Sequence, residues 1–141
     1  MSATVSVTRE FAHSAEQLFD AWLAPELAQR FLFATSTGRI VRCEIDPHPG
    51  GRFLIADLRD GEEVEHHGEY LVLDRPRRLV FSFTVPKYSG VWTEVEVVFA
   101  PTPAGCAIAL THTGVLPEWA ASTEAGWRGI LEALEGVLAA V

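Results

Sequence analysis

The feature that most constrains the fold is an alternation of apolar and polar residues that returns in one segment after another. In the first segment, Val5, Val7 and Phe11 share one side of the pattern, and polar residues such as Thr8 occupy the other. A period of two residues is the signature of a β-strand with one buried and one solvated face. The same alternation recurs, with turn residues in between, over residues 39–46, 53–59, 62–74, 79–85, 93–99 and 108–112. Strands of this kind, joined by short turns, predict an antiparallel sheet that is covered on one side only.

Two short helices are predicted between the first and second strands. Ser14 and Gln17 have the spacing of a capping box, in which the serine caps the helix and the glutamine reaches back. Apolar residues follow at helical spacing and predict an amphipathic helix over residues 14–23. Pro25 ends that helix, and residues 26–31 have the pattern of a second short helical piece.

The C-terminal segment supplies the long helix that must cover the sheet. A helix from Pro117 to Ala140 would be about 36 Å long, and a proline is favourable in a first helical turn. Its apolar stripe consists of Trp127, Ile130, Leu131, Leu134, Val137 and Leu138. Three glycines, Gly126, Gly129 and Gly136, interrupt it, and each costs about 1 kcal/mol relative to alanine. Close approach of the helix to the sheet would explain these glycines, and so would space left for a ligand.

The 141 residues have the composition of one globular domain, spanning residues 1–141. The chain is 48% hydrophobic and 21% charged, with a net charge of -8 and a pI near 5.0. A field of that sign disfavours nucleic acids and anionic membrane surfaces as partners, and the basic residues of segment 75–78 have the pattern of a solvated turn. No signal-peptide pattern and no apolar run of membrane-spanning length is present, so a cytoplasmic location is expected.

Both cysteines lie inside strand patterns. The alternation over residues 39–46 places Cys43 on one face together with Val41 and Ile45. Cys106 lies far along the chain, and neither cysteine has the spacing of a CxxC or metal motif. Two free thiols are therefore expected, which fits a cytoplasmic protein.

Polar residues on the predicted apolar faces are the candidates for chemistry. By strand parity these are His66, Tyr70 and His112, together with Arg9 and Asp57. A histidine with an ordinary pKa of about 6.5 can transfer a proton at neutral pH, and a tyrosine can donate a hydrogen bond to an oxyanion. The alternative is that these groups are buried and satisfied by the backbone or by water.

Neither a metal nor a cofactor is expected. His66 and His67 are adjacent on one strand, so their side chains point to opposite faces and cannot bind the same ion. Aromatic residues on the apolar faces would form cavity walls, or alternatively plain core; they include Phe53, Phe81, Phe83 and Trp127. Trp92 and Tyr88 flank a glycine-bearing loop, where aromatic side chains commonly grip a ligand, and Trp119 lies near the start of the long helix.

Several short motifs, in their order and spacing, match a known family. They are residues 11–22 (FAHSAEQLFDAW), 50–53 (GGRF), 68–70 (GEY), 74–79 (DRPRRL), 93–97 (TEVEV) and 126–127 (GW). On these motifs the chain resembles the activator-of-Hsp90-ATPase-like branch of the START and Bet v 1-like superfamily, over nearly its whole length. The resemblance implies an α+β helix-grip fold, in which a curved antiparallel sheet of about seven strands, with two short helices, wraps one long C-terminal helix.

The resemblance also implies a cavity between the sheet and the long helix, and three functions stay open. The first is binding of a small, mostly hydrophobic or aromatic molecule, with His66, Tyr70 and His112 as polar contacts. The second is a cyclase-like or aromatase-like enzyme, with His66 or His112 as general acid or base and Tyr70 orienting a carbonyl group. The third is a chaperone-associated role through protein contacts. A homodimer is compatible with each of them.

Overall fold

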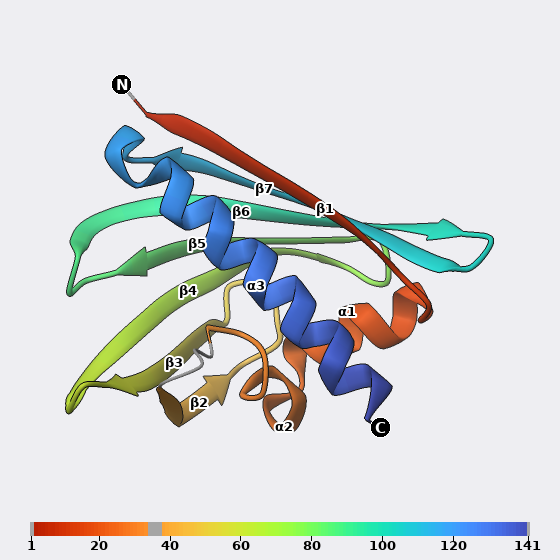
Figure 1. The fold of residues 1–141 in the computed structure, drawn as a ribbon, viewed down its shortest axis with the longest axis horizontal. Coiled ribbons are helices and arrows are strands. Elements are labelled where there is room, and N and C mark those ends of the chain that lie inside the picture. Colours follow the sequence, from red (N-terminus) through yellow and green to blue (C-terminus); the bar gives the residue numbers. More distant parts are fainter. Residues whose placement is uncertain (1, 34–37, 141) are drawn as a thin grey trace.

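The computed structural model describes residues 2–33 and 38–140, in which seven strands and three α-helices occur (Figure 1). In chain order the elements are β1 Ala3–Phe11, α1 Ala15–Leu23, α2 Pro25–Ala28, β2 Arg39–Ile45, β3 Arg52–Arg59, β4 Glu62–Asp74, β5 Arg78–Val85, β6 Ser89–Thr102, β7 Gly105–Val115, a 3-10 turn Pro117–Trp119 and α3 Ala120–Ala139. The predicted α+β helix-grip architecture is confirmed.

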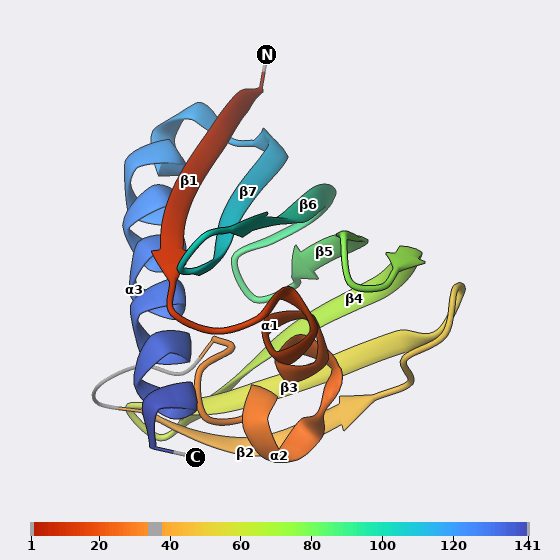
Figure 2. The same ribbon diagram turned by 90° about the vertical axis from the view of Figure 1, so that its right-hand side faces the viewer.

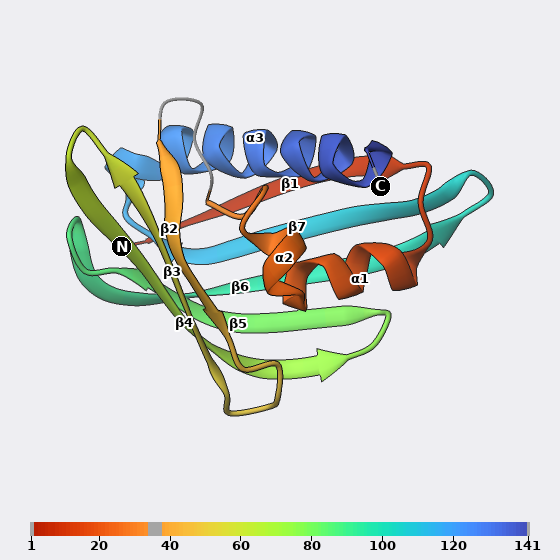
Figure 3. The same cartoon turned by 90° about the horizontal axis from the view of Figure 1, so that it is seen from below.

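All seven strands form one antiparallel sheet in the order β1-β7-β6-β5-β4-β3-β2. Six of the strands follow one another as a meander, and β1 joins β7 at the far edge, where Val5 pairs with His112. The sheet curves strongly, and α3 runs along its concave side next to β1 and β7 (Figure 2). Helices α1 and α2 lie on the same side, near the C-terminal half of α3 (Figure 3).

The N-terminal end of α1 is fixed by the capping box that the sequence predicts. The backbone N–H of Gln17 donates to Oγ of Ser14 at 3.1 Å, and Oε1 of Gln17 accepts from the backbone N–H of Ser14 at 3.2 Å. Trp22 on α1 is 1% exposed and stacks against Trp127 of α3, with ring centroids 6.4 Å apart. Helices α1 and α3 are thus packed together through the buried rings of Trp22 and Trp127.

The predicted inner face of β2 is wrong at one residue. Val41 is 41% exposed, whereas Ile40 packs against the core together with Cys43 and Ile45. The cause is a shift of register between Ile40 and Arg42 in the pairing with β3. A single extra residue in a strand reverses the face of every side chain before it, and strand parity alone does not reveal where this happens.

The apolar stripe of α3 is confirmed, because all six of its residues are buried. The α-helix begins at Ala120 after a 3-10 turn, so it is 20 residues and about 30 Å long, shorter than predicted. Close approach to the sheet does not explain its glycines: a Cβ atom at Gly126, Gly129 or Gly136 would meet nothing within 4 Å. All three glycines are exposed, and only Gly126 lines a cavity.

Both cysteines are free, and Cys106 is buried. Within the part of the chain that the structure describes, no helix combines the length and apolarity that crossing a bilayer requires.

Candidate functional site

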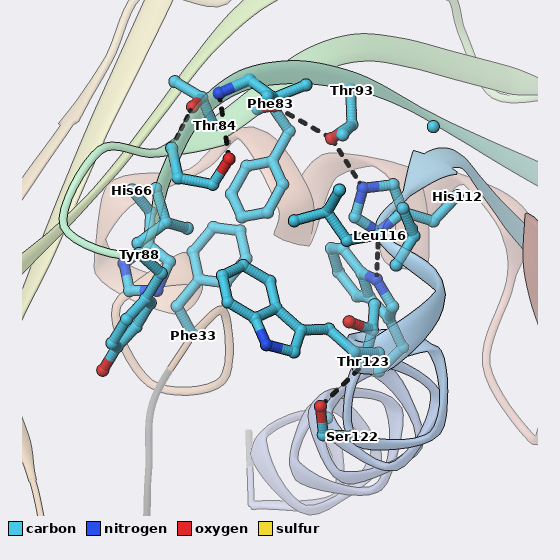
Figure 4. Close-up of a pocket in the computed structure, with 18 of the residues that line it drawn as sticks. Phe33, His66, Phe83, Thr84, Tyr88, Thr93, His112, Leu116, Ser122 and Thr123 are labelled. Carbon is cyan, nitrogen blue, oxygen red and sulfur yellow. Dashed lines mark hydrogen bonds between the residues drawn. The ribbon is translucent and has the colours of Figure 1, made fainter. Parts of the chain in front are cut away.

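A cavity of about 500 Å³ lies between the N-terminal half of α3 and the concave face of the sheet (Figure 4). Aromatic residues form much of its wall: Phe33, Phe83, Tyr88, Trp119 and Trp127. The aliphatic and glycine positions are Val85, Val91, Gly114, Val115, Leu116, Gly126 and Ile130. The polar side chains are those of Arg59, His66, Thr84, Ser89, Thr93, His112, Ser122 and Thr123. The wall is therefore mainly apolar, with polar groups at a few defined places.

Phe33 forms the aromatic floor of the cavity. Its ring stacks on His66 at 4.3 Å with an interplanar angle of 6°, and on Phe83 at 5.0 Å with an angle of 7°. The backbone of Phe33 has a φ of 61°, an uncommon and strained conformation for an aromatic residue. Sequence reasoning missed Phe33, because only its place after a short helix and beside Phe31 and Leu32 hints at a core role.

His112 on β7 is held by hydrogen bonds on both ring nitrogens. Nε1 of Trp127 donates to Nδ1 at 3.0 Å, so Nδ1 has no proton and Nε2 carries it. Nε2 then donates to Oγ1 of Thr93 at 2.7 Å, and Thr93 donates to the carbonyl oxygen of Phe83 at 2.9 Å. Burial lowers the pKa of His112 to about 4, so the ring is neutral at neutral pH. This network is complete without a ligand.

His66 on β4 has the opposite tautomer and one unused nitrogen. Its Nδ1 lies 3.0 Å from the carbonyl oxygen of Ile55, which can only accept, so Nδ1 carries the proton. Burial is the largest influence on this ring and lowers its pKa to about 4. Nε2 is therefore unprotonated at neutral pH, and it has no hydrogen-bond partner among the described residues. The pKa near 6.5 that the sequence suggested does not hold for either cavity histidine.

A charged pair, Asp57 and Arg59, lies beside the cavity, and Arg59 is part of its wall. Asp57 is fully buried, and its Oδ2 accepts from Nε of Arg59 at 2.5 Å. Nη1 of Arg59 donates to the hydroxyl of Tyr88 at 3.4 Å. Tyr88 and Trp119 meet edge to face at 6.4 Å, and both are partly exposed. Both aromatic residues line the cavity, and their exposure places them on its solvent-facing side.

The structure brings together four of the eight residues predicted to bind a ligand. His66, Phe83, His112 and Trp127 line the cavity, and their role as ligand contacts stays a prediction. Phe53, Tyr70 and Phe81 do not line it. They pack with one another instead, with the Phe53 ring 5.6 Å from Tyr70 and 5.4 Å from Phe81, and burial raises the pKa of Tyr70.

Trp92 and Arg9 also lie away from the cavity. Thr93 points into the cavity, so its neighbour Trp92 points to the outer face of the sheet, where it is 55% exposed and lies near His67 and Leu54. Arg9 forms an ion pair with Glu135 of α3. Trp92, predicted as a ligand contact, therefore does not line this cavity, because strand parity at Thr93 sets the opposite face.

Among the residues described, no group of three or more histidine, cysteine, aspartate or glutamate side chains has a metal-binding arrangement.

Comparison with protein families gives a match over most of the chain. The family model for the Activator of Hsp90 ATPase homolog 1-like protein matches residues 12–139. The chain belongs to this family. The resemblance inferred from the sequence motifs is thereby confirmed for this AHSA1-like protein.

Solved structures share the AHSA1-like fold. A Staphylococcus aureus protein of unknown function has a TM-score of 0.88 at 16% identity, covering 99% of this chain and 95% of the other. A Chromobacterium violaceum protein has a TM-score of 0.86 at 19% identity, covering 95% of both chains. The AHSA1-like protein from Aeromonas hydrophila has a TM-score of 0.82 at 25% identity, covering 98% of this chain and 93% of the other. The comparison with curated proteins found no match.

The two histidines of this AHSA1-like cavity do not converge on one point. His66 is on β4 and His112 on β7, with β5 and β6 between these strands in the sheet. The ring of Phe83 lies between them, with its centroid 6.1 Å from His66 and 5.7 Å from His112. General acid–base chemistry needs two groups within hydrogen-bond reach of the same reacting atoms, and this geometry separates them.

Proposed function

We propose that this protein binds one small, mostly apolar molecule in the cavity between α3 and the sheet. The observation that carries the proposal is the cavity itself. Its volume of about 500 Å³ lies within the range of about 300–1,000 Å³ typical of small-molecule sites, and aromatic rings form much of its wall. Burying a ligand against such a wall is favourable because it removes apolar surface from water.

The glycine at position 126 supports the same interpretation. Gly126 lines the cavity, and a Cβ atom there would meet nothing within 4 Å. The residue costs about 1 kcal/mol in helix stability relative to alanine, and no contact with the sheet requires it. A larger side chain would occupy space beside Trp127 and Ile130 that is now open to a ligand.

Binding is favoured over the cyclase or aromatase alternative. Both nitrogens of His112 are engaged within the protein and Tyr70 lies outside the cavity. The carboxylate beside His66, that of Asp57, is fully buried and does not line the cavity. The remaining polar groups are suited to orienting a bound molecule. A few fixed polar groups on an apolar wall are the usual basis of orientation in small-molecule sites.

A fluorescence titration tests the proposal. N-phenyl-1-naphthylamine, an uncharged apolar probe, is titrated into the wild type and into Gly126→Leu and Gly129→Leu variants. We expect saturable binding of one probe per chain, weakened by about tenfold in Gly126→Leu because its side chain overfills the cavity. Gly129→Leu is the matched control, since Gly129 is in the same helix but outside the cavity wall. Absence of saturable binding, or equal binding by all three proteins, would overturn the proposal.

A further inference from the structure

We propose that His66 selects the ligand, and that the ligand is an uncharged planar aromatic molecule whose O–H or N–H group donates a hydrogen bond to His66 Nε2. This inference rests on the proposed function, because it concerns the same cavity. It is carried by three independent features of the wall: the tautomer of His66, the access of its Nε2 atom, and the stacked rings around it.

The tautomer follows from the partner of His66. The carbonyl oxygen of Ile55 accepts the Nδ1 proton at 3.0 Å and has no proton to give in return. Nε2 is left with a lone pair and can only accept. Asp57 stabilises this arrangement, because its Oδ1 lies 3.8 Å from the same Nδ1 atom. His66 therefore presents an acceptor with a fixed direction.

The Nε2 atom is accessible from the cavity. In the described part of the chain, the polar side-chain atoms that are both fully enclosed and unpartnered are Arg9 Nε, Trp22 Nε1 and Asp57 Oδ1. Nε2 of His66 has no partner there and is not among them, although the residue as a whole is only 5% exposed. Since His66 lines the cavity, we infer that the remaining access of Nε2 is to the cavity.

The rings around His66 favour a planar ligand. Phe33 and His66 are parallel within 6°, Phe33 and Phe83 within 7°, so three flat surfaces share one orientation. A flat aromatic molecule can add a further layer to such a stack with favourable offset contacts. His112 cannot compete for its polar group, because Trp127 and Thr93 already occupy both of its nitrogens.

The charge of this wall favours an uncharged ligand. Both cavity histidines are neutral, and the guanidinium of Arg59 is paired with the carboxylate of Asp57. An ionised ligand would lose its hydration without gaining an unpaired counter-charge. A neutral molecule that lacked a donor would also bind less well, because it would bury Nε2 without a hydrogen bond.

The test compares two probes that differ in the donor alone. 2-Naphthol has a hydroxyl donor, whereas 2-methoxynaphthalene keeps the ring and the oxygen but cannot donate. Their affinities are measured by quenching of tryptophan fluorescence in the wild type and in His66→Phe, which keeps an aromatic ring to stack on Phe33 but has no acceptor. We expect the ratio of the two affinities to favour 2-naphthol by about fivefold to tenfold more in the wild type than in His66→Phe.

The outcomes separate this inference from the proposed function. Equal ratios in the two proteins, with both probes bound, overturn the role of His66 and leave cavity binding intact. No binding of either probe to the wild type overturns both. Because His66→Phe could fail to fold, side-chain ¹⁵N spectra of the wild type supply a second measurement: His66 must show a protonated Nδ1, and its Nε2 resonance must move with 2-naphthol and stay with 2-methoxynaphthalene. A protonated Nε2 on His66 contradicts the inference directly.

Discussion

The indole Nε1 of Trp127 donates a hydrogen bond to Nδ1 of His112 at 3.0 Å. This contact joins α3 to β7 inside the protein, where both side chains are less than 5% exposed. It also fixes the tautomer of His112 and, through Thr93, ties β7 to β6 and to the backbone of β5. The wall of the cavity is therefore held in place by a polar network that does not need the ligand.

Replacing Trp127 by phenylalanine should be strongly destabilising. The variant leaves Nδ1 of His112 buried without a donor and removes part of a core side chain, so we expect a loss of about 2–4 kcal/mol in the free energy of unfolding. Urea denaturation measures it. Trp92→Phe is the control, because Trp92 is 55% exposed and should change stability by less than about 0.5 kcal/mol. Equal effects of the two substitutions on the free energy of unfolding would contradict a stabilising role for the Trp127–His112 hydrogen bond.

The two cavity histidines should make the protein less stable in mild acid. Their pKa is about 4 in the folded protein, against about 6.5 in the unfolded chain. Between these values the unfolded chain binds more protons, so the free energy of unfolding falls as the pH falls from 6.5 towards 4. Each histidine should account for a loss of about 2 kcal/mol between pH 7 and pH 5. Urea denaturation at both pH values should show a smaller loss in His66→Phe; the same loss in both proteins would refute this prediction.

Alanine at Gly129 should stabilise the protein. Nothing lies within 4 Å of a Cβ atom at this position, and alanine is favoured over glycine in a helix by about 1 kcal/mol. For a chain of this size we expect a Tm about 3 °C higher in a thermal unfolding experiment. Gly126→Ala should give a similar gain, since its Cβ also meets nothing. A lower Tm for either variant would mean that the helix backbone is in closer contact than the structure indicates.

Removing the guanidinium of Arg59 should destabilise the protein, because a buried carboxylate lies beside it. Asp57 is fully buried, so Arg59→Met leaves a charge without a counter-ion and should cost about 3–5 kcal/mol. The double variant Asp57→Asn/Arg59→Met should recover much of that loss, because the charge is then absent. Arg42→Met breaks the exposed pair with Glu44 and should cost less than about 1 kcal/mol. Urea denaturation of the three variants tests the comparison, and a cost for Arg59→Met no greater than that of Arg42→Met would contradict it.

Much of the fold could be predicted from the sequence, because period-2 alternation and the stripe of α3 are local patterns set by which face is buried. The capping box of Ser14 and Gln17 is equally local. Two errors have different causes. A bulge after Ile40 exposes Val41, and it depends on pairing with a neighbouring strand, which alternation within one segment does not encode. Trp92 is predicted to flank a loop, whereas it belongs to β6 and follows the alternation that Thr93 sets.

The cavity was harder to predict than the fold. His66, Phe83, His112 and Trp127 could be selected by parity, but parity cannot distinguish a residue at the open end of the sheet from one at the packed end, as Tyr70 and Phe81 show. Phe33 follows a short helix, and its own backbone has a positive φ. Nothing in the residue type phenylalanine predicts that conformation. The pKa values of the histidines depend on burial and partners, which only the folded chain defines.

Native mass spectrometry of the protein isolated from its own cells tests cavity binding most directly. We predict that the 15.5 kDa chain carries the added mass of one small molecule, which is released on denaturation and recovered in an organic extract. Gly126→Leu, isolated in the same way, should carry much less of it. A wild-type protein that shows only the mass of the chain in every preparation, and the same spectrum as Gly126→Leu, would contradict a ligand-binding function for this cavity.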